Sequence, residues 1–166
     1  MVNGIYFTKM ASLGKNKQPA ELTFTKGLDV LTGASNTGKS YVVQCLDYIL
    51  GSGVPPKPIQ ESAGYDRIRA ELRTCDGRIF TLERMFSPNR IDNYIYVAEC
   101  QFELFDEFKE KQPLQVFYYK HDDRNEKNIS RFLLKLIGLD GKKLRVDDQN
   151  HKKPLFSPSC KFSVCR

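Results

Sequence analysis

The sequence of 166 residues predicts an α/β fold, in which a partial core of strand, loop and helix adjoins an antiparallel β-subdomain. The first observation is that residues 33–40 read GASNTGKS, which matches the pattern G-x-x-x-x-G-K-[ST] of phosphate-binding loops. The second is that this run stands between a β-prone run and one with helical apolar spacing. The third is the alternation of apolar and charged residues after that helix, typical of antiparallel strands.

The first three β-prone runs span residues 5–9, 21–25 and 28–32. The first two are joined by a polar stretch, 14–19, whose Gly, Asn and Pro residues favour a turn. The third reads LDVLT and ends directly at Gly33. We therefore expect a strand that leads straight into the loop.

A helix is predicted over residues 39–50, because its apolar residues recur at the spacing of one helical face. These residues are Val42, Val43, Leu46, Ile49 and Leu50. The stretch 51–58 is rich in Gly and Pro and can continue neither a helix nor a strand. We expect an exposed connection there.

Three strands are predicted next, over residues 65–74, 78–86 and 91–98. Asp76-Gly77 lies between the first two and is a strong hairpin signal. Apolar and charged residues alternate along the first strand, which indicates one buried and one solvated face. The apolar set is Ile68, Ala70 and Leu72, and the charged set is Arg67, Arg69, Glu71 and Arg73.

The last elements are a short amphipathic helix over 102–111, a strand over 116–119 and a helix over 129–139. Asn128 is placed to cap the start of this helix, and Gly138 lies at its end.

The residue types of the loop explain its chemistry. Gly33 lets the chain turn sharply off the strand, and Gly38 lets the backbone approach a phosphate without a Cβ atom in the way. The Lys39 ammonium can reach the β- and γ-phosphates, and the Ser40 hydroxyl is placed to bind Mg²⁺. Asn36 tolerates the positive φ for which such loops often use Gly. We expect the phosphates to be bound by Gly33, Ala34, Ser35, Asn36, Thr37, Gly38, Lys39 and Ser40.

Composition favours a single globular domain in the cytoplasm. Hydrophobic residues make up 40% of the chain and charged residues 28%, and the net charge is +6. The apolar runs are too short to span a membrane, and the N-terminus lacks a signal-peptide pattern. The basic excess is compatible with a nucleic-acid partner without showing one. The five cysteines indicate reduced thiols and have no zinc-binding spacing: Cys45, Cys75, Cys100, Cys160 and Cys165.

Residues 28–33, Lys39-Ser40 and the run 46–51, LDYILG, resemble the N-terminal segment of bacterial SMC-like and RecN-like ATPases, also described as AAA or ABC-type ATPases. The resemblance covers about residues 3–155. It implies a P-loop NTPase fold of the ABC or SMC-head type, with a partial core and an antiparallel β-subdomain. Residues 1–155 would then form the N-terminal ATPase head segment, and residues 9–13 would be a weaker candidate for the adenine side.

The resemblance also implies cofactors and partners. The family's heads bind ATP and Mg²⁺, and a head is completed by a C-terminal half and dimerises with a second head around ATP. The family couples ATP to DNA in repair, chromosome organisation or anti-phage defence, so DNA is a candidate partner.

The sequence departs from this family in the residues that hydrolyse ATP. It contains no apolar run ending in Asp-Glu and no signature like Leu-Ser-Gly-Gly, so we do not expect autonomous hydrolysis. The nearest substitutes have no distinctive context: acids at Asp122 and Asp123, γ-phosphate sensors at Gln101 or Gln115, and Glu99 at the end of a strand.

Residues 156–166 change character and form an irregular tail rich in Ser, Cys and Phe. We hypothesise a disrupted reading frame near Leu155 and a truncated head; a naturally short protein is the alternative. Two other functions stay open. One is a self-contained small P-loop kinase or phosphotransferase, with Arg84 and Arg90 as lid residues. The other is a non-enzymatic protein that holds nucleotide as a structural ligand.

Overall fold

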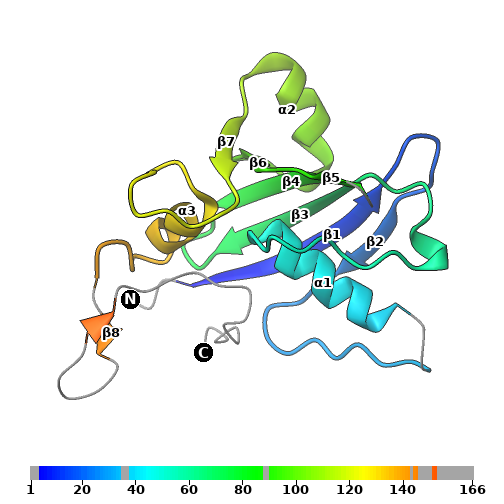
Figure 1. Ribbon diagram of the computed structural model, residues 1–166, viewed down its shortest axis with the longest axis horizontal. Coiled ribbons are helices and arrows are strands. Elements are labelled where there is room, and N and C mark those ends of the chain that lie inside the picture. The colour runs from blue at the N-terminus through cyan, green and yellow to red at the C-terminus, as the bar shows by residue number, and fades with distance from the viewer. Residues whose placement is uncertain (1–3, 35–37, 88–89, 143, 146–150, 153–166) are drawn as a thin grey trace.

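The computed structural model describes residues 4–34, 38–87, 90–142, 144–145 and 151–152. Its architecture is mixed α/β and is built on one antiparallel sheet (Figure 1). Across the sheet the strands are β2 (Ala20–Thr23), β1 (Ile5–Leu13), β3 (Arg67–Thr74), β4 (Ile79–Ser87), β6 (Tyr94–Ala98) and β7 (Gln115–Tyr118). In addition, β5 (Arg90–Ile91) pairs with the end of β4, and β8 (Leu144–Arg145) pairs with β9 (His151–Lys152).

The hairpin of β3 and β4 forms the middle of the sheet and turns where the sequence predicts. Gly77 has a φ of 94°, and the Gly77 amide donates to the Thr74 carbonyl at 3.0 Å. The hairpin register is continuous from Arg67 opposite Met85 to Arg73 opposite Ile79. The expected antiparallel β-subdomain is therefore confirmed.

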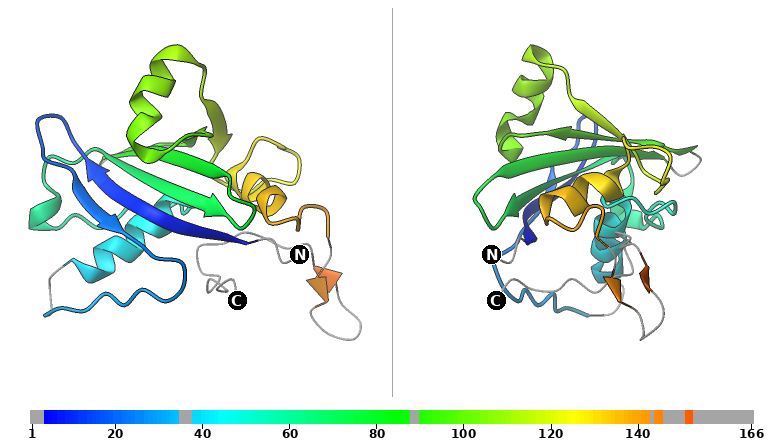
Figure 2. Two further views of the ribbon diagram at one scale, coloured as in Figure 1. Left: turned by 180° about the vertical axis from the view of Figure 1, so that it is seen from behind. Right: turned by 90° about the vertical axis from the view of Figure 1, so that its left-hand side faces the viewer.

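Two helices cover one face of the sheet, α1 (Lys39–Ile49) and α3 (Ile129–Leu136). Figure 2 shows them on the same side, opposite the helix α2 (Phe105–Lys111). The cap expected for α3 is confirmed, because the Arg131 amide donates to Asn128 Oδ1 at 2.9 Å. The core lies between these helices and the sheet. It includes Met10, Cys45, Tyr48, Ile49, Leu50, Ile68, Ala70, Leu72, Phe80, Leu82, Ile95, Val97, Ile129 and Leu133.

The face of the sheet expected to be solvated is partly covered. A short 3-10 helix, η2 (Phe102–Leu104), and α2 lie over it, and the rings of Phe102 and Phe105 are buried there. Arg69 is only 4% exposed and donates to Glu83 and to Asp106 of α2. Burial would lower the pKa of Arg69, but its two acidic partners outweigh that effect and raise it.

The strand predicted over residues 28–32 is wrong, because the structure places no strand there. The segment has no neighbouring strand among the described residues, and a strand needs a partner for its backbone groups. Its local contacts are turn-like, since the Thr25 amide donates to both carboxylate oxygens of Asp29 at 3.1 Å. The antiparallel sheet is thus present as expected, whereas the expected P-loop core of strand, loop and helix is not confirmed.

Arg84 of β4 is fully buried and joins the sheet to the end of α1. Its Nη1 donates to the carbonyls of Tyr48, at 2.5 Å, and Ser52, at 2.8 Å, while Nε and Nη2 donate to the Asp92 carbonyl at 3.1 and 2.8 Å. The guanidinium carbon lies 3.7 Å from the centroid of the Tyr48 ring and 4.8 Å from that of Tyr119. Burial lowers the pKa of Arg84 to about 10, so the group is still a cation at neutral pH.

We expect Arg84→Ala to lower the free energy of unfolding by about 3 kcal/mol or more. It removes the donors to three carbonyls and opens a cavity between α1 and the sheet. Urea denaturation measures the loss. The matched control is Arg78→Ala, whose exposed pair with Glu99 should be worth less than about 1 kcal/mol. Equal small losses in both variants would contradict a structural role for Arg84.

Candidate phosphate-binding site

The candidate site lies at the start of α1, where the phosphate-loop motif ends. Of its eight residues the structure describes Gly33, Ala34, Gly38, Lys39 and Ser40; residues 35–37 lie outside the described part. Gly38 has a φ of 79°, the left-handed conformation that glycine adopts without strain, and α1 begins at the next residue. The sequence therefore predicted correctly where the helix begins.

Lys39 turns its side chain back across the loop. Its ammonium donates to the Gly33 carbonyl at 2.8 Å and to the Ala34 carbonyl. A cation held by main-chain carbonyls at the mouth of a loop can exchange these acceptors for phosphate oxygens, which form stronger, charge-assisted hydrogen bonds. The structure thus brings Lys39 together with Gly33 and Ala34.

The start of α1 favours an anion. No side chain caps the helix at Gly38, and the first turn contains no acidic residue. The first hydrogen bond of the helix runs from the Val42 amide to the Gly38 carbonyl at 3.1 Å. The N-terminal amides and the positive end of the helix dipole therefore face the same region as Lys39. Ser40 is exposed beside them in the first turn.

The buried side of α1 anchors the helix and plays no part in the candidate chemistry. Cys45 is fully buried, and burial raises the pKa of its thiol to about 12. Tyr41 is half-buried, and burial raises its pKa to about 12 as well. Both groups are neutral at physiological pH, so the charge of the site comes from Lys39 and the helix start.

The segment that leads into the loop is apolar and exposed. The side chains of Leu28, Val30 and Leu31 are 83%, 72% and 48% exposed, which is unusual for large aliphatic residues. In Figure 1 this segment bows away from the sheet below α1. The loop is therefore followed by the packed helix α1 and preceded by a segment whose apolar side chains are exposed.

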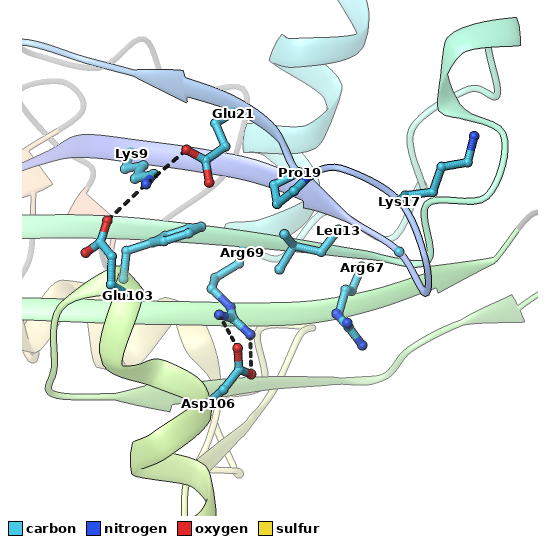
Figure 3. A pocket seen from close by; sticks show the side chains of 11 residues that line it. Lys9, Leu13, Lys17, Pro19, Glu21, Arg67, Arg69, Glu103 and Asp106 are labelled. Carbon is cyan, nitrogen blue, oxygen red and sulfur yellow. Dashed lines mark hydrogen bonds and ion pairs between the residues drawn. The ribbon is translucent and has the colours of Figure 1, made fainter.

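The side chains of the adenine-side candidate, residues 9–13, alternate between the two faces of the sheet, and Met10 packs in the core with residues of α1. The stretch is the second half of β1, where Met10 and Ala11 are buried. Lys9 forms ion pairs with Glu21 at 3.0 Å and with Glu103 of η2 at 2.9 Å (Figure 3). Because η2 lies on the face opposite α1, the Lys9 side chain points away from the phosphate loop.

The other nominated residues do not converge on the loop. Glu99 pairs with Arg78 at 2.9 Å, and Asp122 accepts from the Arg124 amide within its own turn. Asp123 faces His121 at 3.4 Å. The remaining residues are Gln101 and Gln115, which are exposed, Arg84, which is buried, and Arg90, whose backbone forms β5.

Sequence reasoning placed Arg69 on a solvated face and Arg84 in a lid, whereas the structure buries both. Charged residues are seldom fully buried, and the groups that hold them come from distant parts of the chain. The alternating pattern in β3 signalled a second face, but nothing in it indicated that α2 would cover that face.

The described residues contain no group of three or more His, Cys, Asp or Glu side chains that could hold a metal ion. Within the same residues, no helix has the length and apolar character needed to cross a membrane. The chain matches no protein-family model, no curated protein and no solved structure.

We expect Gly38→Ala to lower the free energy of unfolding by about 1 kcal/mol, because alanine is strained at this φ. The added methyl group itself has room, since the nearest atom is Ile59 Cδ1 at 3.6 Å. Thermal and urea denaturation without nucleotide measure the change. Ser40→Ala, exposed in the first turn, is the control and should change stability by less than about 0.5 kcal/mol. A gain in stability for Gly38→Ala would mean that residue 38 is helical and would contradict the left-handed cap.

Proposed function

We propose that this chain binds Mg-ATP through residues 33–40, as the phosphate-binding segment of an SMC-like or RecN-like ATPase head. One observation carries the proposal: Lys39, the first residue of α1, folds back onto the Gly33 and Ala34 carbonyls directly after a left-handed Gly38. That arrangement follows a complete phosphate-loop motif, so sequence and geometry point to the same ligand.

The proposed chemistry uses the groups already in place. Phosphate oxygens replace the carbonyls of Gly33 and Ala34 as acceptors for the Lys39 ammonium. The amides at the start of α1 bind the same phosphates. The Ser40 hydroxyl fits a hard cation that prefers oxygen ligands, and Mg²⁺ bound there neutralises charge on the triphosphate.

The sheet weighs against the alternative of a small kinase. Such kinases continue from the first helix into a parallel βαβ arrangement, whereas β3, β4 and β6 follow α1 here as antiparallel neighbours. Arg84, the first lid candidate, is fully buried and bonded to carbonyls, so it cannot reach a substrate phosphate.

We expect Lys39→Ala to weaken the binding of Mg-ATP about tenfold or more, because a charge-assisted hydrogen bond to phosphate is lost. Isothermal titration calorimetry measures the affinity. Lys135→Ala, an exposed lysine in the last turn of α3, is the matched control and should leave the affinity unchanged. If both variants and the parent protein bound Mg-ATP with equal affinity, the proposed site would be contradicted.

We infer further that the exposed segment 28–31 is where the head takes up its partner strand. Leu28, Val30 and Leu31 present exposed apolar side chains just before the loop. Uncovered apolar surface and unpaired backbone of this kind promote association. The proposed occupant is a strand of another ATPase segment, either a C-terminal half or a second head.

We expect the isolated chain to self-associate through this segment at micromolar concentrations. Val30→Asp places a charge on the apolar surface and should shift the population toward monomer, as measured by multi-angle light scattering. Val54→Asp is the matched control, because Val54 is 69% exposed against 72% for Val30. A parent protein that stays monomeric would count against an uncovered pairing segment.

A further inference from the structure

The chain that leaves α1 turns back along the same helix. Gly51 has a φ of 110°, and the amides of Gly51 and Ser52 donate to the carbonyls of Tyr48 and Asp47 at 3.1 and 3.0 Å. These bonds close the end of the helix and reverse the direction of the chain. The strap, residues 55–62, then runs beside α1 toward its start and ends in the 3-10 helix η1 (Gln60–Ser62) (Figure 1).

Hydrogen bonds fix the strap at its middle and at its end. The Lys57 amide donates to Gln44 Oε1 at 2.8 Å, which attaches the strap to the second turn of α1. Further along, the amide and the hydroxyl of Ser62 donate to the Ile59 carbonyl at 3.0 and 2.7 Å. The Ile59 amide donates in turn to Ser62 Oγ at 3.0 Å. The backbone of Ile59 is thus held on both sides.

This geometry places the Ile59 side chain next to the last glycine of the phosphate-loop motif. A Cβ atom built on Gly38 would lie 3.6 Å from Ile59 Cδ1, an ordinary van der Waals distance. Gly38 has the left-handed φ of 79°, and its carbonyl accepts the first hydrogen bond of α1 from the Val42 amide at 3.1 Å. Ile59 therefore stands beside the residue that sets both the end of the loop and the start of the helix.

The composition of the strap makes it stiff. Three of the four residues before Ile59 are prolines, Pro55, Pro56 and Pro58, and each fixes its own φ. Prolines leave the unfolded chain less backbone freedom to lose on folding, so a proline-rich segment takes up a defined position at a low cost in entropy. Pro56 is also buried. The strap is therefore suited to carry Ile59 to a fixed place.

We propose that the strap holds the phosphate loop in its binding conformation, with Ile59 as the positioning residue and the contact between Lys57 and Gln44 as its anchor. The inference rests on the proposed function for its ligand, Mg-ATP. A loop that must be ordered when its ligand arrives binds more weakly than one already ordered. Ile59 acts through Gly38 and is not itself a ligand of the phosphates.

The first test needs no nucleotide. Hydrogen exchange followed by NMR measures the protection of the Val42 amide, which depends on the Gly38 carbonyl. We expect Ile59→Ala and Gln44→Ala each to lower this protection about threefold or more. The Phe132 amide is the internal control, because its bond to the Asn128 carbonyl at 3.2 Å is the corresponding bond of α3. Protection at Val42 equal to that of the parent protein in both variants would overturn the proposal.

The second test is isothermal titration of the full chain with Mg-ATP. Ile59→Ala and Gln44→Ala should each weaken the affinity about threefold or more, because the loop is less ordered before binding. Two conservative variants should restore it to within about twofold of the parent protein. Ile59→Leu keeps a δ-methyl group, and Gln44→Glu keeps an oxygen acceptor for the Lys57 amide. Val54→Ala is the matched control, since Val54 precedes the strap and is 69% exposed.

The strap and the nucleotide site fail in different ways. If the parent protein binds Mg-ATP through Lys39 and both Ile59→Ala and Gln44→Ala bind equally well, the nucleotide site stands and the strap inference is wrong. If the parent protein does not bind Mg-ATP, the proposed function is wrong, and protection of the Val42 amide alone decides whether the strap holds the loop. If Ile59→Ala does not fold, Gln44→Ala decides both tests, because Gln44 is partly exposed.

Discussion

The structure depends on the buried cation of Arg84. Its guanidinium has no carboxylate among its hydrogen-bond partners and is held by the carbonyls of Tyr48, Ser52 and Asp92. Carbonyls at the C-terminal end of α1 carry a partial negative charge and have no N–H donor within the helix. A cation beside them is therefore favourable. One side chain of β4 thereby fixes the end of α1 against the sheet. Because a helix is stiff, fixing one end also directs the other end, where the phosphate-loop motif ends.

The two faces of the sheet are stabilised differently. Beneath α1 and α3 most contacts are apolar, and burial of aliphatic and aromatic surface supplies the driving force. Beneath α2 a charged network replaces them, with Arg69 between Glu83 and Asp106. Such a network specifies one docking position for α2 more than it adds stability, since desolvation offsets much of the attraction.

Local signals in the sequence predicted local structure well. Asp76-Gly77 forms its turn, Asn128 caps α3 and Gly38 precedes α1, because each of these depends on a few neighbouring residues. The prediction of a strand over residues 28–32 was wrong for the opposite reason, because a strand needs a partner strand from a distant part of the chain or from another chain. Burial of Arg69 and Arg84 was equally hidden, because the groups that hold Arg69 lie 14 and 37 residues away along the chain and those that hold Arg84 lie 8 to 36 residues away. The candidate site was predictable as a motif, whereas its exposed approach was not.

The absence of a strand over residues 28–32 affects how the candidate phosphate loop is held. In a core where strand, loop and helix are all packed, the loop is shaped from both sides. Here α1 is fixed by Arg84 at its far end and by Cys45 and Tyr48 in the core, while Leu28 and Val30 face solvent. Lys39 then supplies an internal cross-link, holding the Gly33 and Ala34 carbonyls against the helix start. Under the proposed function, a triphosphate that takes over the ammonium would release these carbonyls. Nucleotide binding and pairing of segment 28–31 would then act on neighbouring residues, which would couple one to the other.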